Sequence, residues 1–175
     1  MPSIIAIPRP TVKGWRETQR TLAALRRAAV GVLDNMISDP TEWTSTWTAT
    51  TTNPTIGTNG GSFLCRYFRY FRFVVMSIYI QFGVIGGAGG WAVGSGTYEF
   101  TLPITPLSGT KATGNGFVID DSTDTHYILT TFITSSNLIR AQRSVSTLLD
   151  HNSPIGYAAN DEIILNLMYP VAEGL

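Results

Sequence analysis

The feature that most constrains the fold of this chain is the pattern of residues 41–175, where short runs of β-forming residues alternate with turn residues. Valine, isoleucine, threonine, tyrosine and phenylalanine recur in the runs, and glycine, proline and asparagine interrupt them at intervals of about 8 to 15 residues. The pattern predicts an all-β domain of about eight antiparallel strands, arranged as a β-sandwich or jelly roll. The expected strands are 43–50, 62–69, 73–84, 96–102, 116–119, 126–133, 138–143 and 161–169.

Residues 1–40 have a different character. Three prolines among the first ten residues fix φ and remove backbone donors, so we expect an extended arm there. The segment 11–36 is rich in leucine, alanine, arginine and glutamine, which favours one α-helix, and Pro40 marks its end. The sequence therefore predicts two parts, an arm with one helix (1–40) and a β domain (41–175).

Apolar residues in the predicted helix are spaced as in a coiled coil. They recur at alternating intervals of three and four residues over about three heptads. Such a seam either docks the helix on its own domain or packs it against copies of itself around an axis. Arginines that lie mostly off the seam are expected to be exposed and to serve as anchors. The seam comprises Trp15, Thr18, Leu22, Leu25, Ala29, Val32 and Met36, and the arginines are Arg16, Arg20, Arg26 and Arg27.

The charges of the two parts differ, although the whole chain is formally neutral. Residues 1–40 hold six of the 12 basic residues and three of the 12 acidic ones, which leaves six basic and nine acidic residues in 41–175. A basic leading segment on a mildly acidic domain suggests that the two parts face different surroundings. The acidic balance of the β domain also argues against a groove that follows nucleic-acid phosphates.

The stretch LCRYFRYFRF places an arginine at every third position of an aromatic run. Basic residues between aromatic ones are typical of single-strand nucleic-acid binding. Strand side chains alternate faces with period two, however, and the 23-residue run around this stretch is too long for one strand. We therefore predict a hairpin turn near Tyr70-Phe71, with Arg69 and Arg72 at its rim and Arg66 on an outer face. The strand that follows, FVVMSIYIQF, is apolar on both faces and is expected to be central.

The order of several short motifs resembles a known family. Trp43 and Trp47 open a threonine-rich strand, NPTIGTNGGSFLCRYFRYFR follows, and a glycine-rich loop, GTYEFTLPI and NDEIILNLMYP come after it. In this order the motifs resemble the carboxy-terminal β domain of actinobacteriophage minor tail and tail-fibre proteins, over about residues 43–170. The sequence departs from the family pattern at Tyr70-Phe71, where the family has a glycine-containing turn, and at Asn160-Asp161, where it has glycine and aspartate.

The resemblance implies a bacteriophage virion protein that forms homotrimers on the particle surface. We expect a non-enzymatic structural protein, a minor tail or tail-fibre protein attached through residues 1–40, with the β domain projecting toward the host. The alternative is a capsid decoration protein, or head fibre, held on the shell through the same basic segment. Expected partners are copies of the chain, other tail or capsid proteins and a host cell-surface glycan. Nucleic acid and insertion into a membrane are not expected.

We expect loops of the β domain to contact the host surface, namely loops 86–96, 106–115 and 120–126. An aromatic side chain in such a loop can stack on a sugar ring, and trimeric display adds avidity to weak single contacts. The candidate contact residues are Trp91, Lys111, Asn115, Asp120, Asp121 and Asp124.

Signals for catalysis or for a cofactor are weak. The glycine-rich stretch 86–96 lacks the lysine and the serine or threonine of a phosphate loop. The acidic stretch 120–126 lacks the spacing of a calcium loop, and His126 and His151 are far apart in the sequence, with no third nitrogen or sulfur ligand. Cys65 is expected to be a small apolar residue packed inside a strand. We expect no catalytic site, no metal and no cofactor.

Overall fold

The computed structural model describes residues 40–172 apart from 136 and 145. The arm and helix predicted for residues 1–40 therefore lie outside the described residues, except for Pro40. The seam and anchor residues between Trp15 and Met36 lie there too.

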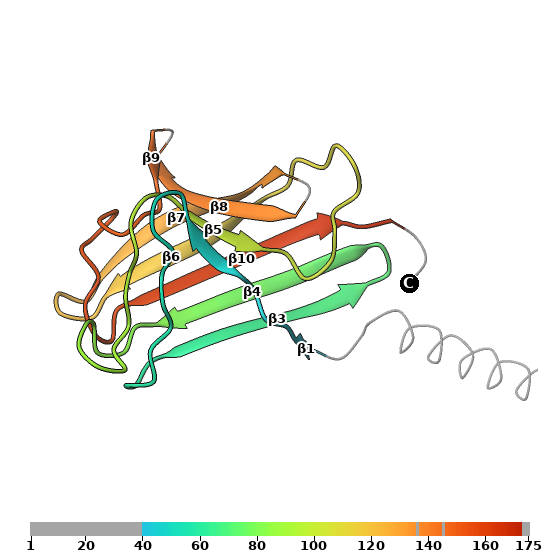
Figure 1. Cartoon of the computed structure of the whole chain (residues 1–175). Helices are drawn as coiled ribbons and strands as arrows, with labels where there is room; N and C mark the ends of the chain where they lie inside the picture. The colour runs from blue at the N-terminus through green and yellow to red at the C-terminus, as the bar shows by residue number, and fades with distance from the viewer. Residues whose placement is uncertain (1–39, 136, 145, 173–175) are drawn as a thin grey trace, which may run out of the picture. The chain divides into compact units, whose positions relative to one another are not determined.

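Ten strands form a single antiparallel sheet in the described part of the chain (Figure 1). Along the sheet the order is β1-β3-β4-β10-β6-β7-β8-β5-β2, and β9 pairs with β8 beside this path. The strand FVVMSIYIQ, apolar on both faces, lies inside the sheet as predicted. The strands are β1 (Thr41–Glu42), β2 (Trp47–Ala49), β3 (Ser62–Tyr70), β4 (Phe73–Gln81), β5 (Tyr98–Thr101), β6 (Thr113–Asp120), β7 (Thr125–Ser135), β8 (Leu138–Ser144), β9 (Thr147–Leu148) and β10 (Glu162–Pro170).

The all-β class is confirmed, and the sheet is curled so that a short link joins its two edges. β1 and β2 are consecutive in the sequence but lie at opposite ends of the strand order. On one side of the link, Trp43 N donates to Cys65 O of β3 at 3.1 Å. On the other side, Thr101 N of β5 donates to Thr46 O at 3.1 Å, and Ser45 Oγ donates to Thr101 O at 2.9 Å. Strand pairing makes this one continuous curled sheet around a single core, and the link ties its first edge to its last.

The inner face of the curled sheet forms the core, which centres on aromatic side chains. Trp47 of β2 packs edge-on against Tyr98 and stacks on Phe100 of β5, with centroid distances of 5.1 Å and 5.9 Å. It also meets Phe82, which follows β4, at 5.8 Å, and Phe82 stacks on Tyr157 at 4.7 Å. These ring contacts join the sheet to the segment before β10. The largest fully buried side chains are Trp91, Tyr98, Tyr169, Phe82, Phe100, Met76, Ile78, Ile80, Leu129, Ile139, Leu149 and Ile163.

Cys65 is a buried core residue of β3, as predicted. Burial raises the pKa of its thiol from 9.0 to about 11, although a backbone hydrogen bond from Ser45 lowers it in part. The thiol is therefore protonated at neutral pH and acts as an apolar packing group.

The predicted hairpin turn is also present. β3 and β4 pair as far as Tyr70 opposite Phe73, so the chain reverses at Phe71 and Arg72. Phe71 has a φ of 54°, in the left-handed region. Arg69 Nε donates to Phe71 O at 3.0 Å, so this arginine supports the turn from its rim.

The two ends of the described domain hold different parts of the chain (Figure 1). At the first, here called the terminal end, the chain enters at Thr41 and leaves after Pro170, beside the β3–β4 turn. The loop 102–112 returns to this end, where Leu107 N donates to Pro170 O at 2.9 Å. The opposite end, here called the loop end, holds the connections 50–61, 82–97, 121–124 and 149–161.

Candidate functional site

Trp91 fixes two of the connections at the loop end to each other. Its side chain is buried, with 1 % of the residue exposed, and its Nε1 donates to Gly60 O at 2.9 Å. Its ring lies 5.9 Å from that of Phe82. The prediction that Trp91 contacts a receptor is therefore wrong, because the indole is used to pack loop 82–97 against loop 50–61 and is not available to a sugar ring.

The glycines near Trp91 leave no room for side chains. A Cβ on Gly61 would collide with Gly83 N and would lie 2.7 Å from Trp91 Cζ2, and Gly61 has a φ of 75°. A Cβ on Gly57 would lie 2.6 Å from Trp91 N. The glycines of NPTIGTNGG thus accommodate the tryptophan of GGAGGW, and two stretches that are separate in the sequence form one unit.

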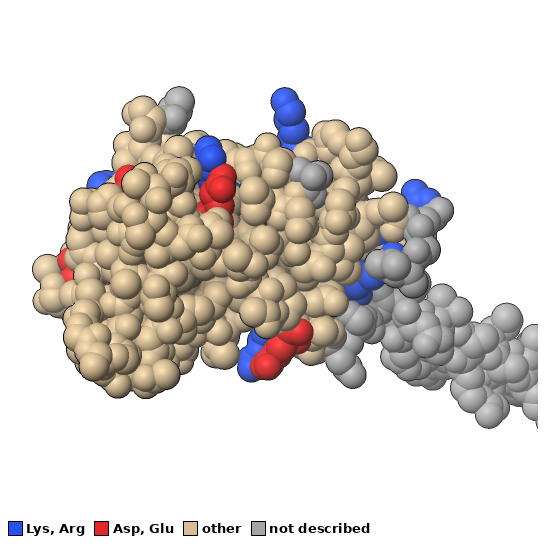
Figure 2. Space-filling model, in the orientation of Figure 1, with Lys and Arg blue, Asp and Glu red and all other residues tan. Residues whose placement is uncertain are grey.

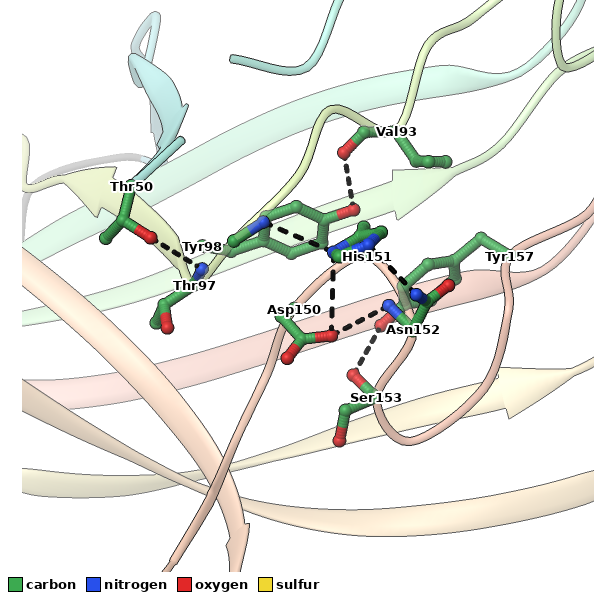
Figure 3. A network of polar contacts seen from close by, with 10 residues as sticks. Thr50, Val93, Thr97, Tyr98, Asp150, His151, Asn152, Ser153 and Tyr157 are labelled. Carbon is green, nitrogen blue, oxygen red and sulfur yellow. Dashed lines mark hydrogen bonds and ion pairs between the residues drawn. The ribbon is translucent and has the colours of Figure 1, made fainter. Parts of the chain in front are cut away.

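A network of polar contacts joins the connection 149–161 to loop 82–97 (Figure 3). Gly96 N donates to His151 Nδ1 at 3.2 Å, and Asn152 Nδ2 lies 2.9 Å from His151 Nε2. Asn152 N donates to Asp150 Oδ1 at 2.7 Å, and this carboxylate lies 3.8 Å from His151 Nδ1. Both ring nitrogens of His151 therefore contact amide groups, and the histidine holds the two loops together.

Two tyrosines beside the network also serve as donors (Figure 3). Tyr98 Oη donates to Val93 O at 2.7 Å, and Tyr157 Oη donates to Ser153 O at 3.4 Å. Burial raises the pKa of both hydroxyls, and the nearby Asp150 carboxylate adds to the rise. Both tyrosines therefore stay protonated and keep their hydrogen bonds at any ordinary pH.

Asp161 is the buried carboxylate of the loop end, with 2 % of the residue exposed. Its Oδ1 accepts from Asp121 N at 3.0 Å and its Oδ2 accepts from Ala158 N at 2.7 Å. One side chain thus fixes the turn after β6 and the loop before β10. Asp161 is not among the site residues predicted from the sequence, and its position in the NDEIILNLMYP motif is the one sequence signal that points to it.

The carboxylates of the acidic turn between β6 and β7 have different partners. Asp120 Oδ1 accepts from Ser122 Oγ at 2.6 Å and from Ser122 N at 3.0 Å, and hydrogen bonds from Ser122 and Thr123 lower the pKa of Asp120. The Asp124 carboxylate lies 3.4 Å from His126 Nε2. Across residues 40–172, leaving aside 136 and 145, no group of three or more histidine, cysteine, aspartate or glutamate residues is placed to hold a metal ion.

The structure separates the remaining predicted contact residues. Asp120, Asp121 and Asp124 come together at the loop end. Lys111 lies at the other end, where it lines an open depression of about 370 Å³ beside loop 102–112. Asn115 is not in a loop, contrary to prediction, because β6 begins already at Thr113 and places Asn115 within the strand. The predicted contact loops therefore do not face one common surface.

Charged side chains do not gather into a basic patch on the face drawn in Figure 2. Several charges of the described chain are in opposite-sign pairs. Arg66 lies 3.0 Å from Glu42, and Arg140 lies 2.6 Å from Glu99. Single-strand binding needs clustered basic groups that are free to meet phosphates, so this arrangement does not favour nucleic acid as a partner.

Comparison with known proteins gives no match: no protein-family model, no curated protein and no solved structure matches this chain. Among the described residues, no helix is long and apolar enough to cross a membrane. Function is therefore inferred from the motifs and from the geometry of the two ends.

Proposed function

We propose that this chain is a non-enzymatic structural protein of a bacteriophage virion, a trimeric minor tail or tail-fibre protein whose β domain contacts the host surface. The observation that carries the proposal is the separation of the chain's exits from its long loops. Thr41 and Pro170 lie at the terminal end, whereas the fixed loops lie at the opposite end. A domain attached to the particle through residues 1–40 then presents its loop end outward.

The construction of the loop end suits recognition. Trp91, His151 and Asp161 hold its loops in place, so little conformational entropy is lost when a ligand binds. The exposed side chains of the acidic turn include Asp121 and Asp124. Carboxylates accept hydrogen bonds from sugar hydroxyls, which supports a cell-surface glycan as the ligand. Three copies would strengthen weak single contacts through avidity.

Backbone conformation supports the likeness to phage tail proteins at the two places where the sequence departs from their pattern. Tyr70-Phe71 stands where that pattern has a glycine-containing turn and Asn160 where it has glycine, and the φ angles of Phe71 and Asn160 are 54° and 72°. Glycine is the residue that adopts positive φ without strain, and asparagine tolerates it better than most others. Both turns therefore keep the conformation that a glycine would supply.

The experiment that tests the proposal is a cryo-EM map of the intact particle in which this chain is located. We expect density at the tail tip or fibres, in few copies per particle. Density at the three-fold positions of the capsid would instead make the chain a decoration protein, held by the basic segment 1–40. Absence from the particle would refute both roles.

A matched pair of variants tests the host contact itself. Particles that carry Asp121→Ala with Asp124→Ala are expected to adsorb to cells more slowly. Glu42→Ala is the control, because it removes an exposed carboxylate from β1, away from the loop end. Equal adsorption by the two variants would argue against contact through the acidic turn.

A further inference from the structure

One broad face of the sheet carries two rows of apolar side chains, several of which the described residues leave exposed. β3, β4, β10, β6 and β7 are neighbours in this order, and alternate residues of each strand point away from the core. The strand register aligns these residues into rows that cross the sheet. We call this surface the outer apolar face. Its first row is Leu64, Tyr79, Ile164, Phe117 and Ile128, its second row is Phe68, Val75 and Met168, and Tyr70 and Phe73 lie at its terminal-end corner.

The exposure of these residues is unusual for a sheet surface. Ile128 is 69 % exposed, Met168 57 % and Leu64 44 %. Of the nine large hydrophobic residues exposed in the described chain, five belong to this face. The solvent side of an antiparallel sheet is normally polar, so the clustering of exposed apolar groups on one face marks an interaction surface.

An uncharged polar row runs between the two apolar rows. Ser77, Asn166, Asn115 and Thr130 align across β4, β10, β6 and β7. Arg66 continues the row on β3, and it is paired with a carboxylate of β1. A face with so little net charge does not suit nucleic acid or an anionic lipid surface, which need clustered basic residues. Amides and hydroxyls both donate and accept hydrogen bonds, so the row can pair with a second copy of itself.

The same face has both hollows and a protrusion. One hollow of about 290 Å³ lies over Leu64 and Tyr79, and another of about 260 Å³ lies over Phe68 and Val75. Both are on the β3–β4 side. Ile128, the most exposed apolar residue of the face, lies on β7 at the opposite side. A face with a protrusion on one side and hollows on the other is complementary to a second copy turned by a two-fold rotation, so that each copy seats its protrusion in the hollows of the other.

We propose that two copies of this chain associate through the outer apolar face, with Ile128 of each copy seated in the β3–β4 hollows of the other. The size of the face fits this role. Five strands about 4.8 Å apart and about nine residues long, at roughly 3.4 Å per residue, give an area of roughly 600 to 700 Å². A stable interface buries about 800 Å² on each partner, so the face is of the right order.

This inference makes the β domain an assembly element, in addition to any role of the seam in residues 15–36. It goes beyond the homotrimer of the proposed function and does not rest on the place of the chain in the virion. A map that places the protein on the capsid instead of the tail would leave it unchanged, because association is measured on the purified protein.

The test is sedimentation of the purified full chain in wild-type and variant forms. Ile128→Lys is expected to weaken association at least about tenfold, because it would bury an unpaired ammonium group in the contact. Met168→Lys is expected to have the same effect from a different strand. Ile56→Lys is the matched control, because it changes an isoleucine of similar exposure, 49 %, in loop 50–61. The control is expected to keep the mass of the wild-type protein.

Three outcomes would overturn the proposal. The first is that the wild-type chain is a monomer. This outcome includes a monomer that binds neutral lipid vesicles through the outer apolar face. The second is a wild-type mass for both Ile128→Lys and Met168→Lys. The third is dissociation caused by Leu22→Asp with Leu25→Asp while the lysine variants stay assembled. Circular dichroism checks that each variant is folded, and if one lysine variant does not fold, the other decides.

Discussion

The indole Nε1 of Trp91 donates a hydrogen bond of 2.9 Å to the carbonyl oxygen of Gly60, and the two residues are 31 positions apart in the sequence. The bond joins loop 82–97 to loop 50–61 at a point where neither has regular secondary structure. Because the indole is almost completely buried, the position of both loops depends on how closely the backbone of 57–61 approaches it.

Gly61→Ala is expected to destabilise the protein much more than Gly86→Ala. The two glycines have similar φ angles, 75° and 78°, but a Cβ on Gly86 meets nothing within 4 Å, whereas one on Gly61 collides with the backbone. We expect a loss of about 1 kcal/mol from φ strain at Gly86 and at least about 3 kcal/mol at Gly61. Urea denaturation measures both, and equal losses would show that the close approach to Trp91 is relaxed in solution.

Trp91→Phe is expected to lower the free energy of unfolding by more than Trp43→Phe. The first change leaves the Gly60 carbonyl without its indole partner, which costs about 1 to 3 kcal/mol. The Nε1 of Trp43 is buried and has no hydrogen-bond partner among the described residues, so its removal also removes an unsatisfied donor. Thermal unfolding of the two variants provides the comparison, and a larger effect at Trp43 would contradict it.

Asp161→Asn is expected to loosen the acidic turn and the loop before β10 together. The two carboxylate oxygens accept from Asp121 N and Ala158 N, and an amide can accept at only one of these positions. We expect a loss of about 1 to 3 kcal/mol and faster hydrogen exchange at both backbone amides. Asp124→Asn is the control, because its side chain is exposed. Faster exchange at only one of the two amides would mean that the loops are not coupled through Asp161.

Cys65 should make stability fall at alkaline pH. Its pKa is raised from 9.0 to about 11 by burial, so the folded state favours the protonated thiol. The resulting stabilisation is complete below pH 9 and is lost as the pH rises toward 11. The buried tyrosines also have raised pKa values, but their ordinary value is 10.0, so they act at higher pH. Denaturation in reducing buffer should show a decrease from about pH 9 to 10 that Cys65→Ala lacks.

The strands were largely predictable from the sequence, because alternation and turn residues are local signals. The position of the hairpin at Phe71 is predictable from strand length alone, and the burial of Cys65 is predictable from the apolar residues around it in the sequence. The link between β1 and β2 was not predictable: residues 43–50 were expected to form one strand, but among them only Trp47–Ala49 do. Within the link, the Ser45 hydroxyl donates to Thr101 O, 56 positions away in the sequence. β9 has only two residues, too few for a pattern.

The candidate site was predicted less well, because its geometry depends on contacts between residues far apart in the sequence. The acidic turn was expected on the surface and is found there, because a dense run of aspartates is stable only in contact with water. The burial of Trp91 depends on glycines in another loop, and the placement of Lys111 depends on the strand order. The residues next to Trp91 and Lys111 in the sequence therefore predict neither the burial of the tryptophan nor the position of the lysine.

The long ladders of the sheet have a mechanical consequence. β4 pairs with β3 and with β10 over nine residue pairs each, and these strands run from the terminal end to the loop end. Their hydrogen bonds lie perpendicular to the strands, so tension between the two ends loads them in shear. Bonds loaded in shear must break together, whereas bonds pulled open from one end break one after another. A domain of this form transmits a pulling force along its length with little extension.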